Sequence, residues 1–468
     1  MKCAHVIALS LLIGIAGHTN DAPGATGGSA AVQLRSGTHE RIEKYRRAHG
    51  VRGIAVVAVV EQDVLLAHGY GMRADGRGPY TAQTACHLYS STKALSSLVF
   101  ASLRADGAFD LNKPLGEYLP DSPAAWREIP FWRLLNHSSG ITDIVDKPDF
   151  ERIDSNPTSG NADVYEVLKR YPLDYQPGQY SRYRQSGYAL AELIATRELH
   201  TTWHGLVVKH VLEPAGAANT FATSLANGKR SAPLLTAAGG YQSTAQDMSR
   251  IFRALNRGAI VAPEFLEELM YSEQYNFSGY SLGSVLETVG GIRTIGHEGG
   301  ASRATIRYAP GKRVGVAVFT DQLDNNEVTL AIADMLIREL VLGEETREPI
   351  AVPVFAMRNG PAQNIIAFFL EESSRPRQRY DFGAAERTLH RLGYLYLKAK
   401  RAPDAVTIFQ LNTREHPNSA NAHDSLGEAY FETADYDRAL TSYERSLVLD
   451  PANYNATAMI ARIRAVRK

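Results

Sequence analysis

Cysteine is nearly absent from this chain of 468 residues, which has two, one of them Cys3 at the very N-terminus. If a leader containing Cys3 is removed, Cys86 remains alone and no intramolecular disulfide can form. A net charge is also lacking, because 50 lysines and arginines balance 50 aspartates and glutamates. A chain without excess charge has no electrostatic footprint for nucleic acid or an anionic membrane, so we expect neither as a partner.

The N-terminal apolar run, residues 4–17, is too short to span a bilayer comfortably. It follows Lys2 and contains Gly14-Ile15-Ala16, a suitable small-residue cleavage site, so we expect a signal peptide over residues 1–18. An uncleaved anchor or a buried strand are the alternatives. Residues 19–38 are rich in Gly, Ala, Ser and Thr and suggest a flexible tether. Export without disulfides indicates the bacterial periplasm or exterior, with no stable membrane span once the signal is removed.

The pattern of apolar residues predicts an antiparallel sheet flanked by helices. Residues 53–60 and 64–70 form a β-rich hairpin, and three more short strands follow at 292–296, 304–308 and 314–320. A helical middle separates these two groups, and an apolar-striped helix at 327–341 closes the domain. The distant strands must therefore meet in one sheet, within a domain that we place at residues 39–342. Residues 343–385 form a linker, and its apolar helix at 365–370 is expected to dock the C-terminal region onto this domain.

The C-terminal region repeats itself with a period of 34 residues. Large residues alternate with small Gly and Ala where two helices of a hairpin would cross closely, and a proline ends each second helix. The matched positions are Leu392-Gly393, Tyr396, Ala405, Phe409 and Pro417, followed by Leu426-Gly427, Tyr430, Ala439, Tyr443 and Pro451. This segment resembles two tetratricopeptide repeats, so residues 386–468 are interpreted as an all-α module of two repeats plus a cap helix, with a protein as its possible partner.

The single Ser-x-x-Lys of the chain, Ser90 to Lys93, opens an apolar helical pattern. The i, i+3 spacing places both side chains on one helical face, near the positive end of the helix dipole. A serine hydroxyl needs a base to become a nucleophile, and a lysine can be that base if burial lowers its pKa. The alternative is a helix cap followed by an exposed lysine.

Three further motifs accompany Ser90 in order along the chain. They are Leu135-Asn-His-Ser-Ser-Gly140, Pro177-Gly178 through Tyr183 to Gly187-Tyr188, and His297-Glu298-Gly299-Gly300. Together they resemble the class C β-lactamase and penicillin-binding-protein-like serine hydrolases over residues 40–342. The resemblance implies an α/β sandwich with a helical second lobe and the nucleophile between the two.

The resemblance also implies roles for individual residues. Ser90 is the nucleophile that forms the acyl-enzyme, and Lys93 accepts its proton. Tyr183 occupies the tyrosine place of the family's Tyr-x-Asn element, where a phenol held between two cations could ionise near neutral pH and pass a proton to the leaving group. The backbone N–H groups of Ser90 and Gly300 would form the oxyanion hole, and Gly299 with Gly300 would let a strand approach the substrate closely.

Two positions depart from the β-lactamase pattern. Gln185 stands where the family has an asparagine that helps to bind the substrate's acyl amide, so the longer side chain moves that donor. His297 stands where lactamases carry the lysine of Lys-Thr-Gly. Histidine can still donate a hydrogen bond but need not be charged, which weakens the case for a substrate carboxylate and is similar to esterase and peptidase members.

The sequence therefore predicts an exported serine hydrolase that acts on small esters, D-amino-acid peptides or β-lactams, in falling order. The motifs imply no cofactor and no metal. The alternative is a catalytically degenerate hydrolase fold that serves as a binding protein through its repeats, which the departures at Gln185 and His297 motivate.

Overall fold

The computed structural model describes residues 33–156, 158–223, 234–300, 303–322, 328–343, 346–377, 379–451 and 453–466. The predicted signal peptide and most of the predicted tether lie outside these residues. Within them, no helix combines the length and the apolar character that crossing a bilayer requires.

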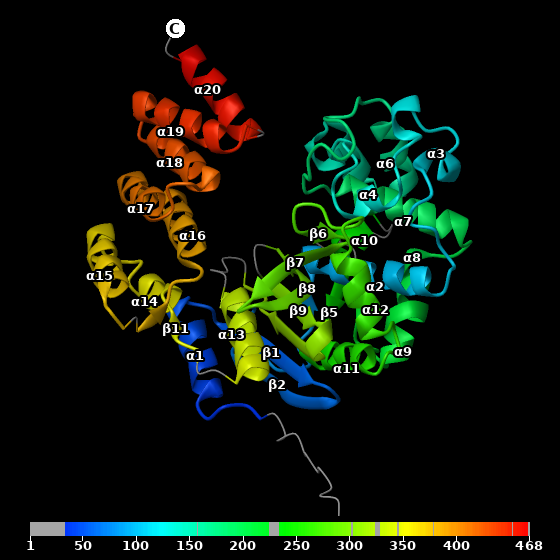
Figure 1. Ribbon diagram of the computed structural model, residues 1–468, viewed down its shortest axis with the longest axis horizontal. Coiled ribbons are helices and arrows are strands. Elements are labelled where there is room, and N and C mark those ends of the chain that lie inside the picture. The colour runs from blue at the N-terminus through cyan, green and yellow to red at the C-terminus, as the bar shows by residue number, and fades with distance from the viewer. Residues whose placement is uncertain are drawn as a thin grey trace, which may run out of the picture. The chain divides into compact units, whose positions relative to one another are not determined.

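A seven-stranded antiparallel sheet, in the order β2–β1–β10–β9–β8–β7–β6, forms the centre of the N-terminal domain (Figure 1). Its strands are β1 (Gly53–Val60), β2 (Asp63–Gly71), β6 (Tyr280–Ser281), β7 (Ser284–Val289), β8 (Ile292–Gly299), β9 (Ala304–Ala309) and β10 (Val314–Phe319). The N-terminal hairpin joins the later strands through β1 and β10, where Ala55 lies opposite Phe319 and Val60 opposite Val314. The predicted meeting of distant strands in one antiparallel sheet is thus confirmed.

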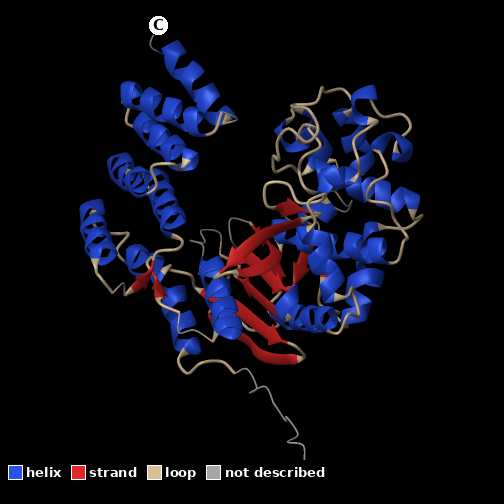
Figure 2. Ribbon diagram, viewed as in Figure 1, coloured by secondary structure: helices blue, strands red, loops and turns tan. Residues whose placement is uncertain are grey.

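Alternate residues of β1 face two different helical layers, because side chains in a strand point to opposite faces. Ala55, Val57 and Val59 pack with α2 (Thr92–Ala105) and α11 (Ala245–Asn256). Ile54, Val56 and Ala58 pack with α1 (Thr38–Ala48) and α13 (Val328–Leu342). Figure 2 shows the sheet between these helices. β1 is apolar throughout because both of its faces are covered.

The region between β2 and β6 is mostly helical, and it supplies the second lobe. Its helices are α3 (Leu115–Tyr118), α4 (Trp132–Leu135), α5 (Asp149–Ser155), α6 (Asn161–Leu168), α7 (Ser186–Glu198), α8 (Trp203–Val207), α9 (Glu213–Ala215), α10 (Thr236–Gly239) and α12 (Pro263–Tyr271). A small antiparallel sheet, β3 (Cys86–His87), β5 (Tyr241–Ser243) and β4 (Phe221–Ala222), lies beside the start of α2. Both α4 and α6 pack on α7, which fixes the helix that follows Tyr183.

The C-terminal region consists of helical hairpins, as the repeats predict. Its helices are α16 (Ala385–Lys398), α17 (Ala402–Glu415), α18 (Ala420–Glu432), α19 (Tyr436–Leu449) and α20 (Tyr454–Val466). A Cβ added to Gly393 would lie 2.3 Å from the ring of Phe409, and one added to Gly427 would lie 3.0 Å from the ring of Tyr443. The small residues of the repeat therefore provide the space that the large ones fill.

The helix predicted at 365–370 was expected to dock the C-terminal region onto the N-terminal domain, but it packs within the C-terminal region instead. That helix is longer, α15 (Ala362–Ser374), and it packs on α17 within the core of the repeats. The contact with the N-terminal domain is made instead by α14 (Ala351–Ala356), which packs on α1. Phe355 lies 4.8 Å from the ring of His49, and Arg358 donates a hydrogen bond of 2.7 Å to the carbonyl of Ala48. The sequence pattern missed α14 because Pro353 interrupts it. A two-residue parallel pair, β11 (Glu348–Pro349) and β12 (Tyr380–Asp381), closes the linker.

Replacing Phe409 with alanine should destabilise the repeats, because its buried ring fills the space above Gly393. Truncations of this kind remove about 3–5 kcal/mol from the free energy of unfolding. We expect a clear fall in the melting temperature of the helical signal in circular dichroism. Thr413→Ala is the matched control, since the Thr413 hydroxyl bonds the Gln410 carbonyl of its own helix. Equal melting temperatures for the two variants would contradict this packing.

Candidate active site

Ser90 lies in a 3-10 turn, Tyr89–Ser91, which leads directly into α2. Tyr89 has a positive φ of 48°, a conformation that costs a non-glycine residue about 1–3 kcal/mol. The Ser91 hydroxyl fastens the turn to the sheet: its single proton lies between the carbonyl oxygens of His297, 3.0 Å from Oγ, and of Ala304, 2.9 Å from Oγ. The turn that carries Ser90 is therefore held by β8 and β9.

Lys93 is completely buried in the first turn of α2. Its Nζ donates to Gln185 Oε1 at 2.9 Å and to the carbonyl of Ala238 at 2.8 Å. Burial lowers the pKa of Lys93 to about 7, with Asp143 opposing that shift. A substantial fraction of this amine is thus neutral at pH 7 and able to accept a proton, as the sequence analysis required of a base.

The side chain of Tyr183 hydrogen bonds with those of Ser90 and Gln185, and Lys93 Nζ lies 4.7 Å from the centre of its ring. Desolvation of the phenol group raises its pKa to about 12, against the lowering effect of those two hydrogen bonds, although the residue keeps 37% of its surface exposed. The expectation that Tyr183 ionises near neutral pH is therefore wrong.

The physical reason is the placement of the neighbouring cations. The Arg182 guanidinium carbon lies 5.4 Å from the ring centre of Tyr175 and 5.7 Å from that of Tyr180. Arg184 forms an ion pair of 2.6 Å with Asp174. The two arginines that flank Tyr183 in sequence thus interact with groups other than its phenolate, while Lys93 is itself depleted of charge by burial.

Gln185 is the residue before α7, and its position is fixed by Asp143. The Asp143 carboxylate accepts hydrogen bonds from the backbone N–H groups of Gln185, at 3.0 Å, and of Ser186, at 3.1 Å. The Gln185 side chain then reaches both Lys93 and Tyr183. The longer side chain at the family's asparagine place is therefore used to connect the candidate base with the candidate proton donor.

The end of β8 approaches the Ser90 turn so closely that only glycine fits. A Cβ on Gly299 would lie 1.9 Å from the carbonyl oxygen of Leu88. Gly300 has a φ of +59°, and a Cβ there would lie 2.5 Å from the ring of Tyr89. The structure thus brings both glycines beside the Ser90 turn, where the sequence analysis expects the oxyanion hole.

His297, two residues earlier on β8, is buried and lies beside Tyr183, with 5.8 Å between the ring centres. Burial is the main cause that lowers the pKa of His297, to about 3, and the charge on Lys93 is the second. The imidazole is therefore neutral at neutral pH, in contrast to a lysine at the same place.

Three further residues belong to the site although the sequence analysis gave them no role. The ring of His137 lies 4.7 Å from that of Tyr183 and 5.1 Å from that of Tyr280. His137 is part of the Leu135–Gly140 motif, so a signal existed, whereas Tyr280 lies on the unpredicted strand β6. Arg303 had no signal at all: its Nε donates to the Gly300 carbonyl at 3.0 Å, and its guanidinium lies 4.4 Å above the Tyr89 ring.

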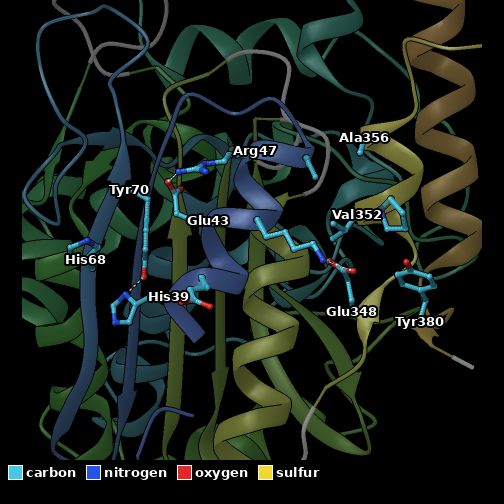
Figure 3. A pocket seen from close by; sticks show the side chains of 13 residues that line it. His39, Glu43, Arg47, His68, Tyr70, Glu348, Val352, Ala356 and Tyr380 are labelled. Atoms are coloured by element: carbon cyan, nitrogen blue, oxygen red, sulfur yellow. Dashed lines mark hydrogen bonds and ion pairs between the residues drawn. The ribbon is translucent and has the colours of Figure 1, made fainter. Parts of the chain in front are cut away.

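A cavity of about 870 Å³ lies elsewhere, between α1, β2 and the linker (Figure 3). Tyr70 and His39 share a hydrogen bond of 2.8 Å on one side, and Lys44 pairs with Glu348 on the other. None of the predicted site residues lines it. Among the described residues, no group of three or more His, Cys, Asp or Glu side chains is arranged to hold a metal.

Comparison with known sequences identifies the family to which this site belongs. The sequence profile described as Beta-lactamase matches residues 39–339, almost two thirds of the chain. The chain belongs to the β-lactamase family. A tetratricopeptide-repeat profile matches residues 420–453.

Solved structures agree in fold. A penicillin-binding-protein homologue from Pyrococcus abyssi, described as octameric, is 22% identical, with a TM-score of 0.54 over 66% of this chain and 77% of that one. The D-amino acid amidase from Ochrobactrum anthropi SV3, complexed with L-phenylalanine amide, is 19% identical, with a TM-score of 0.55 over 66% of this chain and 100% of that one. At these identities the comparison shows a shared β-lactamase-like fold.

Curated relatives match only short segments. Superkiller protein 3 of Schizosaccharomyces pombe is 38% identical over 72 residues, 15% of this chain and 5% of that protein. Superkiller complex protein 3 of Homo sapiens is 33% identical over 89 residues, 19% of this chain and 6% of that protein. The chain thus spans about a twentieth of the length of these relatives, which therefore say nothing of its activity.

Arg303→Ala should slow the reaction of Ser90 with a fluorophosphonate, because it removes the group that ties Tyr89 to Gly300. We expect a loss of roughly 10-fold or more in the second-order rate constant, since removal of one preorganising group commonly has such an effect. Arg293→Ala is the matched control, because Arg293 is a residue of β8 itself but pairs with Glu267 at the surface. Equal labelling rates for both variants would show that Arg303 does not hold the turn.

Proposed function

We propose that this member of the β-lactamase family is an exported serine hydrolase that cleaves an ester or an amide through an acyl-Ser90 intermediate. The observation that carries the proposal is Lys93, a wholly buried amine one helical turn after Ser90, whose pKa is lowered to about 7. A buried lysine with no carboxylate in contact is costly for stability, and groups with such shifted pKa values cluster at functional sites, which supports a catalytic role for Lys93.

The first step is attack of Ser90 Oγ on the substrate carbonyl carbon. Neutral Lys93 accepts the hydroxyl proton as the new C–O bond forms, and the carbonyl oxygen becomes an oxyanion. The backbone N–H groups of Ser90 and Gly300 are the proposed donors to that oxyanion. The close approach of β8 at Gly299 supports this placement, since it brings the two backbone segments together.

The second step is expulsion of the leaving group. The Tyr183 phenol, which stays protonated because its pKa is about 12, gives its proton to the leaving oxygen or nitrogen. The ammonium of Lys93 restores that proton, and Gln185, which bonds both side chains, holds the pair in place. Water then cleaves the acyl-Ser90 ester by the reverse use of the same groups, which regenerates the enzyme.

The substrate is proposed to be a small ester, a D-amino-acid peptide or amide, or a β-lactam. The shared fold with the D-amino acid amidase supports an amide or peptide. Export to the periplasm or exterior is proposed from the N-terminal sequence alone. The tetratricopeptide repeats are proposed to bind a protein partner, since their concave surfaces commonly do so.

A catalytically degenerate binding protein is the second candidate, and the departures at Gln185 and His297 favour it. The enzyme remains the better proposal because Gln185 contacts both Lys93 and Tyr183 and so takes part in the same arrangement. A binding protein would show neither labelling by a fluorophosphonate nor turnover of any ester or amide.

Ser90→Ala should abolish both fluorophosphonate labelling and turnover of p-nitrophenyl acetate, since removal of a nucleophile typically costs several orders of magnitude in rate. Mass spectrometry should map the adduct of the wild-type protein to the peptide that contains Ser90. Ser102→Ala is the matched control: Ser102 lies on α2, the helix that follows the Ser90 turn, and its hydroxyl hydrogen bonds His210 at 3.0 Å. Wild-type turnover in a folded Ser90→Ala variant would overturn the mechanism.

The pH dependence of kcat/KM should report the titration of Lys93. Below its pKa of about 7 the ammonium form has no lone pair, so the rate should fall about tenfold for each pH unit. Above that value the rate should level off, because Tyr183 keeps its proton until pH approaches 12. Lys93→Met should remove this fall of kcat/KM at acid pH, together with most of the activity. A wild-type profile in which kcat/KM keeps rising until about pH 10 would contradict a buried neutral base.

A further inference from the structure

The hydrogen-bonding character of His297 is fixed by its own strand. Its Nδ1 lies 2.5 Å from the carbonyl oxygen of Glu298. A carbonyl oxygen can only accept, so Nδ1 carries the proton, and in a neutral imidazole Nε2 then carries a lone pair. His297 therefore presents an acceptor, and not the donor that the sequence analysis allowed for.

This acceptor is buried and has no hydrogen-bond partner among the described residues. A buried polar atom left unpaired is destabilising, so an unpaired atom in a native structure calls for an explanation. Its place supplies one: the ring of His297 lies beside the ring of Tyr183, the proposed donor to the leaving group. A ligand that reacts at Ser90 brings its leaving group to this phenol.

The surroundings of His297 do not favour an anionic leaving group. Arg307 lies on the neighbouring strand β9, and its Nη2 pairs with Glu287 at 2.7 Å and with Glu298 at 2.9 Å. Lys93 is neutral when the substrate binds, as its proposed role as the base requires. A carboxylate brought to Nε2 would meet a lone pair, so it would lose its hydration without gaining a donor.

An amide N–H meets the requirement. We propose that His297 Nε2 accepts a hydrogen bond from the N–H of the leaving group, so that the site selects amides with an uncharged leaving group over substrates that carry a carboxylate beside the scissile bond. This inference rests on the proposed function and names its substrate class.

The same hydrogen bond favours the transition state over the bound substrate. When the C–N bond breaks, the nitrogen takes the proton of the Tyr183 phenol and leaves as a neutral amine, while Ser90 keeps the acyl group. As that proton arrives, the nitrogen becomes more positive, and its original N–H becomes a stronger donor to Nε2. An ester oxygen has no hydrogen to offer, so esters cannot use this interaction.

The test compares substrates with a common acyl group, a p-nitroanilide and a p-nitrophenyl ester, in three variants. His297→Phe keeps a ring of similar size but removes the acceptor, so the ratio of anilide to ester kcat/KM should fall at least tenfold. His297→Gln offers a carbonyl acceptor and should restore part of that ratio. His423→Phe, a change in the repeats, is the matched control and should leave the ratio at its wild-type value.

A second pair of substrates tests the exclusion of carboxylates. D-Alanyl-D-alaninamide and D-alanyl-D-alanine share the scissile N–H and differ in the charge beside it. The wild type should prefer the amide at least tenfold, and His297→Lys should reduce or reverse that preference. Anilide and ester rates that fall in parallel in His297→Phe, or an unchanged dipeptide preference in His297→Lys, would overturn the inference while leaving acyl-Ser90 chemistry intact. Absence of fluorophosphonate labelling at Ser90 in the wild type would instead reject the proposed function itself.

Discussion

The burial of one charged group, Lys93, is the constraint on which the site depends. An ammonium removed from water loses several kcal/mol of solvation, and protons leave it more readily as a result. Its two hydrogen bonds are to a side-chain amide oxygen and to a backbone carbonyl, neither of which is charged. A carboxylate at either place would restore the usual pKa of a lysine. Burial among neutral partners therefore lowers the pKa of Lys93, and desolvation likewise raises the pKa of Tyr183 and lowers that of His297.

The second constraint is the close contact between the Ser90 turn and the end of β8. Tyr89 is held with a positive φ, and such strain persists only where the surroundings fix the backbone. The Ser91 hydroxyl hydrogen bonds to carbonyl groups of β8 and β9. The Arg303 guanidinium hydrogen bonds to both the Tyr89 hydroxyl and the Gly300 carbonyl. Gly299 and Gly300 are required because any side chain there would separate the two segments. The oxyanion donors that we propose belong to those segments, so their spacing is fixed before a substrate arrives.

Much of this architecture could be predicted from the sequence because it follows local patterns. The hairpin of β1 and β2 and the strands β8 to β10 are apolar and bounded by turns, and the repeats recur at a fixed period. β7 was missed because Ser284, Glu287 and Thr288 break its apolar pattern, and the two-residue strand β6, which carries Tyr280, was missed as well. The ordering of Ser90, Lys93, Tyr183 and His297 could be read from motifs. Their protonation could not, since it depends on burial and on where Arg182 and Arg184 point, and both are set by tertiary packing.

The order of the three pKa values determines the direction of proton transfer in the proposed mechanism. His297, at about 3, stays neutral and exchanges no proton at neutral pH. Lys93, at about 7, accepts and returns a proton with little cost in either direction. Tyr183, at about 12, holds its proton until a leaving nitrogen becomes basic enough to take it. In the proposed mechanism the phenol is therefore unsuited to deprotonate Ser90 but suited to protonate the leaving group, and Lys93 is the group that deprotonates Ser90. Gln185 connects these two groups through one amide, whose oxygen faces the amine, so a residue that departs from the family pattern is consistent with the same chemistry.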